Sequence, residues 1–197
     1  LPLYPQFSTT TTKSSLEDFE EQYHSSGGDA ILVEIKHFFQ NDTYNRAVIE
    51  RIKERVGLDE CKDFDIIFSA HGVPQSVIYA GDVYQKHIEK HVVILTQMLE
   101  DEGMKFNDVH LAYQSKIGPV EWLTPSLEDK LKDIKSRGVV ICPIAFTIDN
   151  SETDFELEIQ YRDVASELGF EDYRVCRCPN DSESFVEALV EIYSKMR

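Results

Sequence analysis

The sequence has no long apolar run, and this absence excludes one class of protein. None of its uninterrupted apolar stretches approaches the roughly 18 residues that a membrane-spanning helix needs. The first residues, LPLYPQFSTTTTKSS, also lack the basic start and apolar middle of a secretory signal peptide. We therefore expect a cytoplasmic protein with no transmembrane segment.

Positive charge is scarce. The chain of 197 residues has 20 Lys and Arg against 36 Asp and Glu, which gives a formal net charge of −16. A protein that binds nucleic acid needs a basic surface, so we expect no nucleic-acid partner. The same charge disfavours docking on an anionic membrane and leaves room only for a weak peripheral contact. It does attract cations, although most of the excess is typical of solvated helix surfaces.

Motifs for disulfide, zinc and nucleotide chemistry are missing as well. The four cysteines form no CxxC pair, and they are Cys61, Cys142, Cys176 and Cys178. We interpret them as reduced thiols of a cytosolic protein. No glycine-rich phosphate loop occurs, and the SAHG stretch does not match the GxSxG elbow of a serine hydrolase.

What the sequence does have is a regular alternation of apolar and amphipathic segments. Strands are predicted at 30–38, 63–70, 108–115, 139–147 and 173–178. Helices are predicted at 43–56, 84–103, 125–138, 151–169 and 182–196, and a loop at 8–15. This alternation predicts an α/β fold with a central parallel sheet flanked by helices. In such folds the ligand site lies beyond the carboxyl ends of the strands.

One candidate lies directly after the second predicted strand. The stretch FSAHGVP ends an apolar run on His71. A lone histidine at this point is more often a turn residue than a ligand. An imidazole at a strand end can also act as a base or a metal ligand beside a carboxylate from a neighbouring strand end. The residue alone leaves both interpretations open.

An acidic segment follows the fourth predicted strand. Steps of three, four and four residues place four of its side chains on one helix face, namely Asp149, Glu152, Glu156 and Gln160. Capping by Asn150 or Ser151 and the positive helix N-terminus account for part of this acidity without any function. A carboxylate row that faces a cleft would instead hold a divalent cation.

Two aromatic features also have alternatives. Trp122 is the only tryptophan, and it can either stack on a flat ligand or fix its loop to the core. His87 and His91 in HIEKH share a helical face, but Glu89 is not where an HExxH motif needs its acid. We therefore interpret HIEKH as part of a surface helix.

Five segments in order resemble the ferrochelatases, the enzymes that insert Fe(II) into a porphyrin at the end of haem synthesis. They are YPQFS, FSAHGVPQSVIYAGDVY, YQSKIGPVEWLTP, PIAFTIDNSETDFELEIQY and CPNDSESFVEAL. The resemblance is to the bacterial type and covers essentially the whole chain. It implies two Rossmann-like domains with a porphyrin cleft between them. It also implies that residues 1–28 cross from a largely missing first domain, that 29–197 form the second domain, and that helix 182–196 packs back on the first.

The resemblance implies roles for individual residues. His71 matches the invariant histidine of the family and Glu152 its key glutamate, which face each other across the macrocycle as catalytic and metal-ligating groups. Asp149 and Glu156 match acidic residues on the metal approach, on a helix with a widened π-type turn. The positions that line or support the porphyrin pocket are Val73, Pro74, Trp122 and Phe146, with Ser115 and Lys116 near a propionate.

The chemistry explains why such groups are needed. A free-base porphyrin must lose its two N–H protons to accept a divalent metal, and a neutral imidazole can take a proton near pH 7. Carboxylates can replace the water ligands of the metal. Tight walls can bend the ring toward the incoming ion.

The resemblance implies substrates but no cofactor. We expect Fe(II) and a porphyrin, protoporphyrin IX before coproporphyrin, as substrates. Neither a Cys-rich C-terminal extension nor a C-x6-C-x-C insertion is present, so no [2Fe–2S] cluster is expected. Asn150 stands where many relatives have His, and Gln160 where some have another acid, which leaves fewer ligands on the metal approach. The alternatives are a cobalt-inserting tetrapyrrole chelatase and a non-catalytic porphyrin- or metal-binding module.

Overall fold

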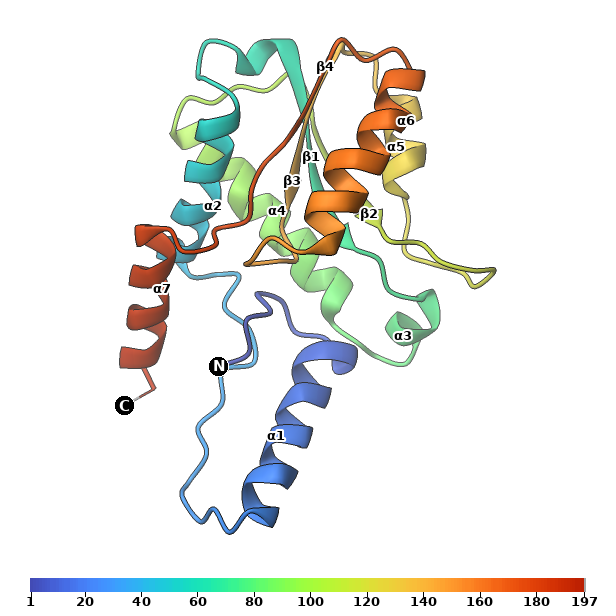
Figure 1. Cartoon of the computed structure of the whole chain (residues 1–197). Helices are drawn as coiled ribbons and strands as arrows, with labels where there is room; N and C mark the ends of the chain where they lie inside the picture. The colour runs from blue at the N-terminus through green and yellow to red at the C-terminus, as the bar shows by residue number, and fades with distance from the viewer. Residues whose placement is uncertain (197) are drawn as a thin grey trace.

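The predicted parallel sheet is confirmed in a computed structural model that describes residues 1–196 (Figure 1). Its strand order is β2-β1-β3-β4, and every neighbouring pair is parallel. The strands are β1 (Phe64–His71), β2 (Val109–Gln114), β3 (Gly138–Pro143) and β4 (Asp172–Val175). β1 and β3 lie side by side at the centre, where buried parallel strands are typically apolar throughout. The segments that follow them therefore leave the sheet at the same edge.

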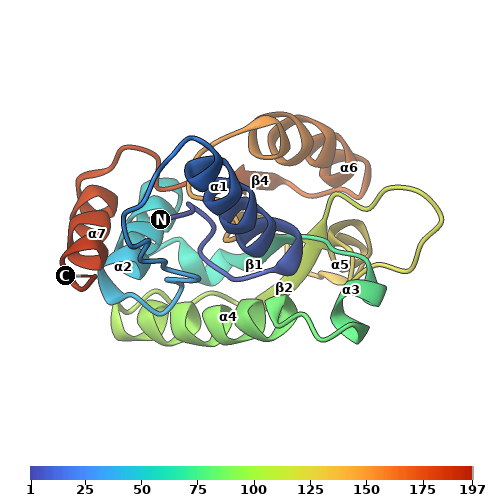
Figure 2. The same ribbon diagram turned by 90° about the horizontal axis from the view of Figure 1, so that it is seen from below.

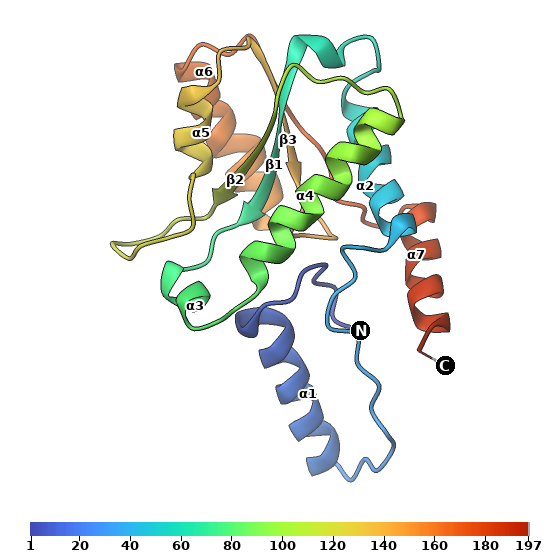
Figure 3. The ribbon, with the colours of Figure 1, turned by 180° about the vertical axis from the view of Figure 1, so that it is seen from behind.

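Helices cover both faces of the sheet, which gives three layers (Figures 1 and 3). On one face lie α2 (Asp42–Arg55), α4 (Tyr84–Asp101) and α7 (Glu183–Ser194). On the other face lie α5 (Leu127–Asp133), the π-helix η3 (Glu152–Gln160) and α6 (Tyr161–Glu167). Alternate residues of β1 serve the two cores, with Ile66 and Phe68 on the first side and Ile67 on the second. Each such fully buried side chain stabilises the fold by about 1.5–3 kcal/mol.

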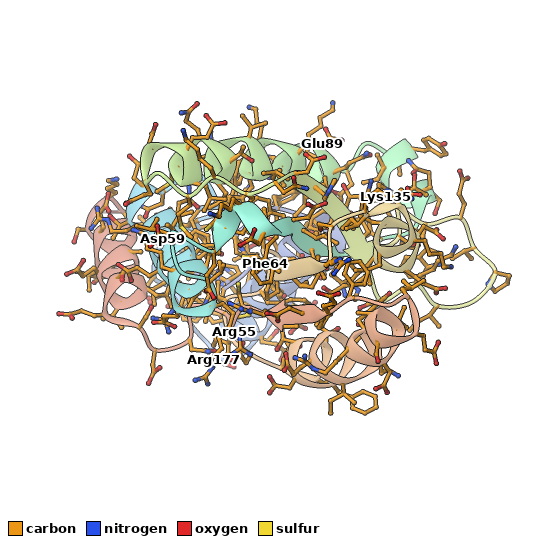
Figure 4. All side chains as sticks on the ribbon, turned by 90° about the horizontal axis from the view of Figure 1, so that it is seen from above. Arg55, Asp59, Phe64, Glu89, Lys135 and Arg177 are labelled. Atoms are coloured by element: carbon orange, nitrogen blue, oxygen red, sulfur yellow. The ribbon has the colours of Figure 1, made fainter. Side chains whose placement is uncertain are left out.

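Two short helices complete the chain around the sheet. A 3-10 turn, η2 (Cys61–Asp63), precedes β1, and α3 (Gln75–Tyr79) follows β1. Figure 4 looks down on the opposite, amino-terminal ends of the strands, with Phe64 near the centre of the view. No helix among residues 1–196 combines the length and apolar composition needed to cross a membrane.

The strand predicted at 30–38 is wrong. This segment runs extended but joins no ladder of the described sheet, and Ile31 is 93% exposed. Its apolar residues are typical of a strand, yet it returns from the far end of α1, away from both sheet edges (Figure 1). Its end is held most closely, where the N–H groups of Phe38 and Phe39 donate to Pro5 O at 2.9 and 3.0 Å, and at its start Ala30 N–H donates to the Tyr23 hydroxyl at 3.1 Å.

The loop predicted at 8–15 is also wrong. A π-helical turn, η1 (Thr9–Lys13), leads into α1 (Ser14–Ser25), and the Ser8 side chain caps the turn by accepting from Thr10 N–H. A run of threonines suggests a loop because β-branched residues have low helix propensity. Tertiary hydrogen bonds to this turn, described below, override that preference.

The prediction of a surface helix around HIEKH is wrong for His91, which is 0% exposed. Its Nδ1 accepts from Gln6 Nε2 and its Nε2 donates to Asn45 Oδ1, both at 2.8 Å. The amide groups fix this tautomer, because Asn45 Nδ2 already donates to Phe39 O and Gln6 Nε2 also donates to Ile144 O. Burial lowers the pKa of His91 to about 3. The neutral imidazole therefore joins α4 to α2 and to the N-terminal segment.

This buried histidine predicts a pH dependence of stability. The unfolded chain binds a proton at His91 below about pH 6.5, whereas the folded chain does not until about pH 3. In that window the unfolded state holds more protons. The free energy of unfolding therefore decreases as the pH is lowered, by up to about 1.4 kcal/mol per pH unit. Urea unfolding between pH 7.5 and pH 5 measures this slope. His91→Gln should flatten it, and the same change at exposed His24 should not; equal slopes in all three proteins would contradict the prediction.

Candidate functional site

A cavity of about 350 Å³ lies beyond the carboxyl ends of β1 and β3. Figure 2 views this end of the sheet, with α1 lying across it. His71, Val73, Pro74, Trp122, Phe146 and Glu152 line one part of the cavity. Mostly apolar walls with a few polar groups are typical of sites for small organic ligands. Six of the ten residues predicted from the sequence thus lie around a single space.

His71 and Glu152 face each other in this cavity. His71 Nδ1 lies 3.6 Å from Glu152 Oε1, and the two side chains are 39% and 35% exposed. Nδ1 itself is buried and has no hydrogen-bond partner among residues 1–196. The His71 ring packs edge-on against Phe146, with the ring centroids 6.1 Å apart. The imidazole therefore has a carboxylate beside it and a ring nitrogen, Nδ1, that no hydrogen bond among the described residues occupies.

The glycine and proline after His71 let β1 and the loop after β2 approach closely. Gly72 N–H donates to Gln114 O at 2.8 Å, and a Cβ on Gly72 would lie only 2.8 Å from that same oxygen. Pro74 and Trp122 then form an antiparallel bridge. The indole N–H of Trp122 donates to Ile117 O at 3.1 Å. Trp122 is thus held by its own loop while its ring borders the cavity.

Glu152 begins the π-helix that was expected from the family resemblance, and the structure confirms that helix type for Glu152–Gln160. Asn150 Oδ1 accepts from Glu152 N–H at 2.8 Å, so Asn150 caps the helix and Ser151 makes no side-chain cap. A π-helix widens the turn and is frequent at functional sites. Here the first residue of the π-helix is Glu152, whose carboxylate faces His71.

Asp149 and Glu156 do not lie with this pair. Asp149 accepts from Cys178 N–H and Asn180 Nδ2 at 2.7 Å each, and from Arg177 at 3.2 Å. Burial raises the pKa of Asp149, but these hydrogen bonds outweigh it and hold the pKa below its ordinary value. Among residues 1–196 no three His, Cys, Asp or Glu side chains are grouped so that they could hold a metal ion.

Glu156 contacts the loop after β2. It accepts from Ser115 N–H at 2.7 Å and from Ser115 Oγ at 2.5 Å. Ser115 has a φ of 64°, in the left-handed region that non-glycine residues seldom adopt. The double hydrogen bond helps to hold that conformation. Lys116, the next residue, is exposed.

Sequence reasoning missed the opposite wall of the cavity. Tyr4, Gln6, Ser8, Thr10 and Thr11 line it from the N-terminal segment. Tyr84 also lines it, and its hydroxyl donates to His71 O at 2.9 Å. The one signal in the sequence was the concentration of hydroxyl donors in STTTT, which a buried acceptor elsewhere in the chain could satisfy.

Comparison with known proteins gives a consistent result. The family model described as Ferrochelatase matches residues 1–197. The curated ferrochelatase of Sulfurimonas denitrificans is 73% identical over 197 residues, which is 100% of this chain and 62% of that protein. The ferrochelatase of Wolinella succinogenes is 48% identical over 193 residues, covering 98% of this chain and 61% of that protein. The chain thus spans about three-fifths of the length of these relatives.

Solved structures support the fold. SirB from Bacillus subtilis, solved with Fe3+, superposes with a TM-score of 0.61 at 10% identity, covering 99% of this chain and 69% of that one. A multi-domain protein of Deinococcus radiodurans, described as structurally similar to chelatases, gives a TM-score of 0.52 at 14% identity, covering 79% and 30%. At such low identity the likeness concerns the arrangement of strands and helices alone.

Proposed function

This chain belongs to the ferrochelatase family, and we propose that the protein it comes from inserts Fe(II) into a porphyrin, protoporphyrin IX first, to make haem. One observation carries the proposal. An imidazole and a carboxylate, His71 and Glu152, stand 3.6 Å apart in a cavity that has one apolar and aromatic wall and faces the hydroxyl-rich N-terminal segment on the other side. Such a pair is suited to removing a pyrrole proton inside a largely apolar cleft.

In the proposed reaction Fe(II) replaces two pyrrole protons, and both protons leave to solvent. The His71 imidazole accepts a proton from a pyrrole nitrogen through Nε2, because Nδ1 is buried and faces Glu152. Glu152 stabilises the imidazolium that forms, because an opposite charge within about 4–6 Å favours the charged form. Both side chains are partly exposed, so the proton can pass on to water. His71 and Glu152 also remain our proposed ligands for the incoming Fe(II), which is a substrate.

The flat ring has a matching wall. Trp122 and Phe146 offer aromatic surface, and Val73 and Pro74 offer a rigid apolar edge. We assign Ser115 and Lys116 to a propionate, because the exposed ammonium of Lys116 can pair with a carboxylate. Asp149 and Glu156 remain predicted residues of the metal approach, and to serve there they would have to release the hydrogen bonds described above. We propose no resident cofactor, and the four cysteines are all buried.

We further propose that residues 1–28 cross from a first domain that supplies the facing wall of the cleft. Three observations support this. α1 buries none of its residues, and Phe19 is 56% exposed. An apolar cavity of about 650 Å³ lies between α1, the extended segment after it and the end of β3. On α7, Val186 and Val190 are at least half exposed, as expected if this helix also packs against that domain.

Zinc insertion followed by porphyrin fluorescence tests the proposal without the oxidation of Fe(II). We would compare this chain with one extended to the full length of its relatives. The extended protein should turn over, and this chain alone should not. Porphyrin binding without turnover in both would favour the binding module, and insertion restricted to cobalt would favour the other chelatase class. Turnover by this chain alone would show that the facing wall is dispensable.

A further inference from the structure

Asp82, in the connection between α3 and α4, is buried and contacts the N-terminal wall of the cavity. Asp82 is only 6% exposed. One oxygen, Oδ2, accepts from Ser8 Oγ at 2.9 Å and from both Thr9 N–H and Thr9 Oγ1 at 2.6 Å. The other, Oδ1, accepts from Tyr84 N–H at 2.8 Å. A buried carboxylate is thus satisfied almost wholly by the turn η1 and its cap.

These contacts determine where a wall of the site stands. Thr10 and Thr11, the residues that follow Thr9, line the cavity that holds His71, whereas Thr9 itself does not. Thr10 Oγ1 also shares a hydrogen bond with Ser8 Oγ at 2.9 Å. Burial of Thr12 and the hydrogen bond from Phe7 N–H to His87 Nδ1 at 3.2 Å also hold this segment, but Asp82 receives the three hydrogen bonds of Ser8 and Thr9 at the start of the turn. The position of this wall relative to His71 therefore depends on the Asp82 carboxylate.

We propose that Asp82 is a positioning residue that sets the width of the porphyrin cleft by anchoring the turn Ser8–Lys13. The proposal rests on the function proposed above. Asp82 touches neither His71 nor the cavity, so its effect reaches the substrate only through the turn. A wall that contacts the ring in both the ground state and the transition state alters KM more than kcat. Its loss should therefore weaken porphyrin binding and leave the chemical step largely unchanged.

Burial and charge favour this role for Asp82 over that of an ordinary loop residue. Burial raises the pKa of its carboxyl, yet the hydrogen bonds from Thr9, Tyr84 and Ser8 bring it below its usual value. The carboxylate is therefore ionised at any pH at which the protein is assayed. Hydrogen bonds to a charged acceptor are stronger than neutral ones.

The test is Asp82→Asn in the full-length protein. An asparagine can still accept from Tyr84 N–H with its oxygen, but its NH2 then faces three donor hydrogens of Ser8 and Thr9. We expect KM for the porphyrin to rise about tenfold, as the loss of a charge-assisted hydrogen bond would give, with kcat within about threefold of wild type. Asp101→Asn removes the same charge from an exposed site on α4 and should change neither constant. Unchanged KM in folded Asp82→Asn overturns the proposal.

Two substitutions at Thr9 keep the test open if Asp82→Asn does not fold. Thr9→Val removes one donor to Asp82 and no cavity-lining atom, and should raise KM about threefold. Thr9→Ser keeps both donors and should match wild type; a rise in KM there, or none in Thr9→Val, counts against the anchor.

Amide hydrogen exchange separates this proposal from the proposed function. The amide of Thr9 should exchange at least about tenfold faster in Asp82→Asn than in wild type, whether or not the protein binds porphyrin. Faster exchange in a protein that inserts no metal would leave the anchor standing and remove the function. Normal exchange in an active protein would remove the anchor alone.

Discussion

Replacing His71 by alanine is expected to reduce metal insertion by the full-length protein about 1,000-fold or more. The Nδ1 atom of the imidazole lies 3.6 Å from Glu152 Oε1 and has no hydrogen-bond partner among residues 1–196. The ring borders the cavity that Trp122 and Phe146 also line. A positioned general base contributes about 10²–10⁴ to rate. Loss of a proposed metal ligand at the same residue would add to that. Zinc insertion, followed as fluorescence of the product, measures the effect.

The substitution should leave the fold intact, which makes the result interpretable. The hydrogen bond that Tyr84 donates goes to the backbone oxygen of residue 71, and alanine retains that oxygen. His24→Ala, at an exposed site on α1, is the matched control. Added imidazole should restore part of the lost rate in His71→Ala, because the deleted ring leaves space in the cavity. Turnover near that of wild type would remove the central assignment of this site.

The pairing of His71 with Glu152 was expected from the family resemblance, and the sheet topology explains it. β1 and β3 are adjacent parallel strands, with Ser69 opposite Pro143. The segments that follow them must emerge at the same edge of the sheet. Apolar composition identified both strands, and the chemistry-bearing residues follow each one. His71 and Glu152 therefore lie at the same edge of the sheet, although they are far apart in the sequence.

Other parts of the site could not be predicted, because they depend on contacts between distant segments. The spacing of Asp149 and Glu156 places them on one helix face only if the helix is regular and begins early. In the structure Asp149 precedes the helix and is held by the segment after β4, while Glu156 lies on a π-helix and contacts Ser115. Likewise, no local preference of STTTT predicts a turn. Its partner, Asp82, lies more than 70 residues away in the chain.

The same reasoning explains the failure at 30–38. A run of apolar residues such as 30–33 predicts that a segment is covered, but not what covers it. Within residues 1–196 Ile31 and Val33 are 93% and 57% exposed. The first domain proposed above would cover these apolar side chains, and the segment would then be buried as its composition predicts.

Glu152→Gln is expected to reduce kcat for insertion at least about 100-fold, with little change in KM for the porphyrin. Glutamine keeps the size of the side chain and the backbone N–H that donates to Asn150, so the start of the π-helix should persist. What it removes is the negative charge beside His71, and with it the stabilisation of an imidazolium and a ligand for Fe(II).

The control for Glu152→Gln is Asp154→Asn, an equal loss of charge at an exposed position of the same helix. If both variants lose activity alike, the helix needs its acidity in general and no specific pair exists. If Glu152→Gln changes the rate by less than threefold, the glutamate serves only the helix N-terminus. A large loss in Glu152→Gln alone, with porphyrin binding retained, would assign the carboxylate to the chemical step, because binding depends on the aromatic and N-terminal walls and proton removal depends on the charge facing His71.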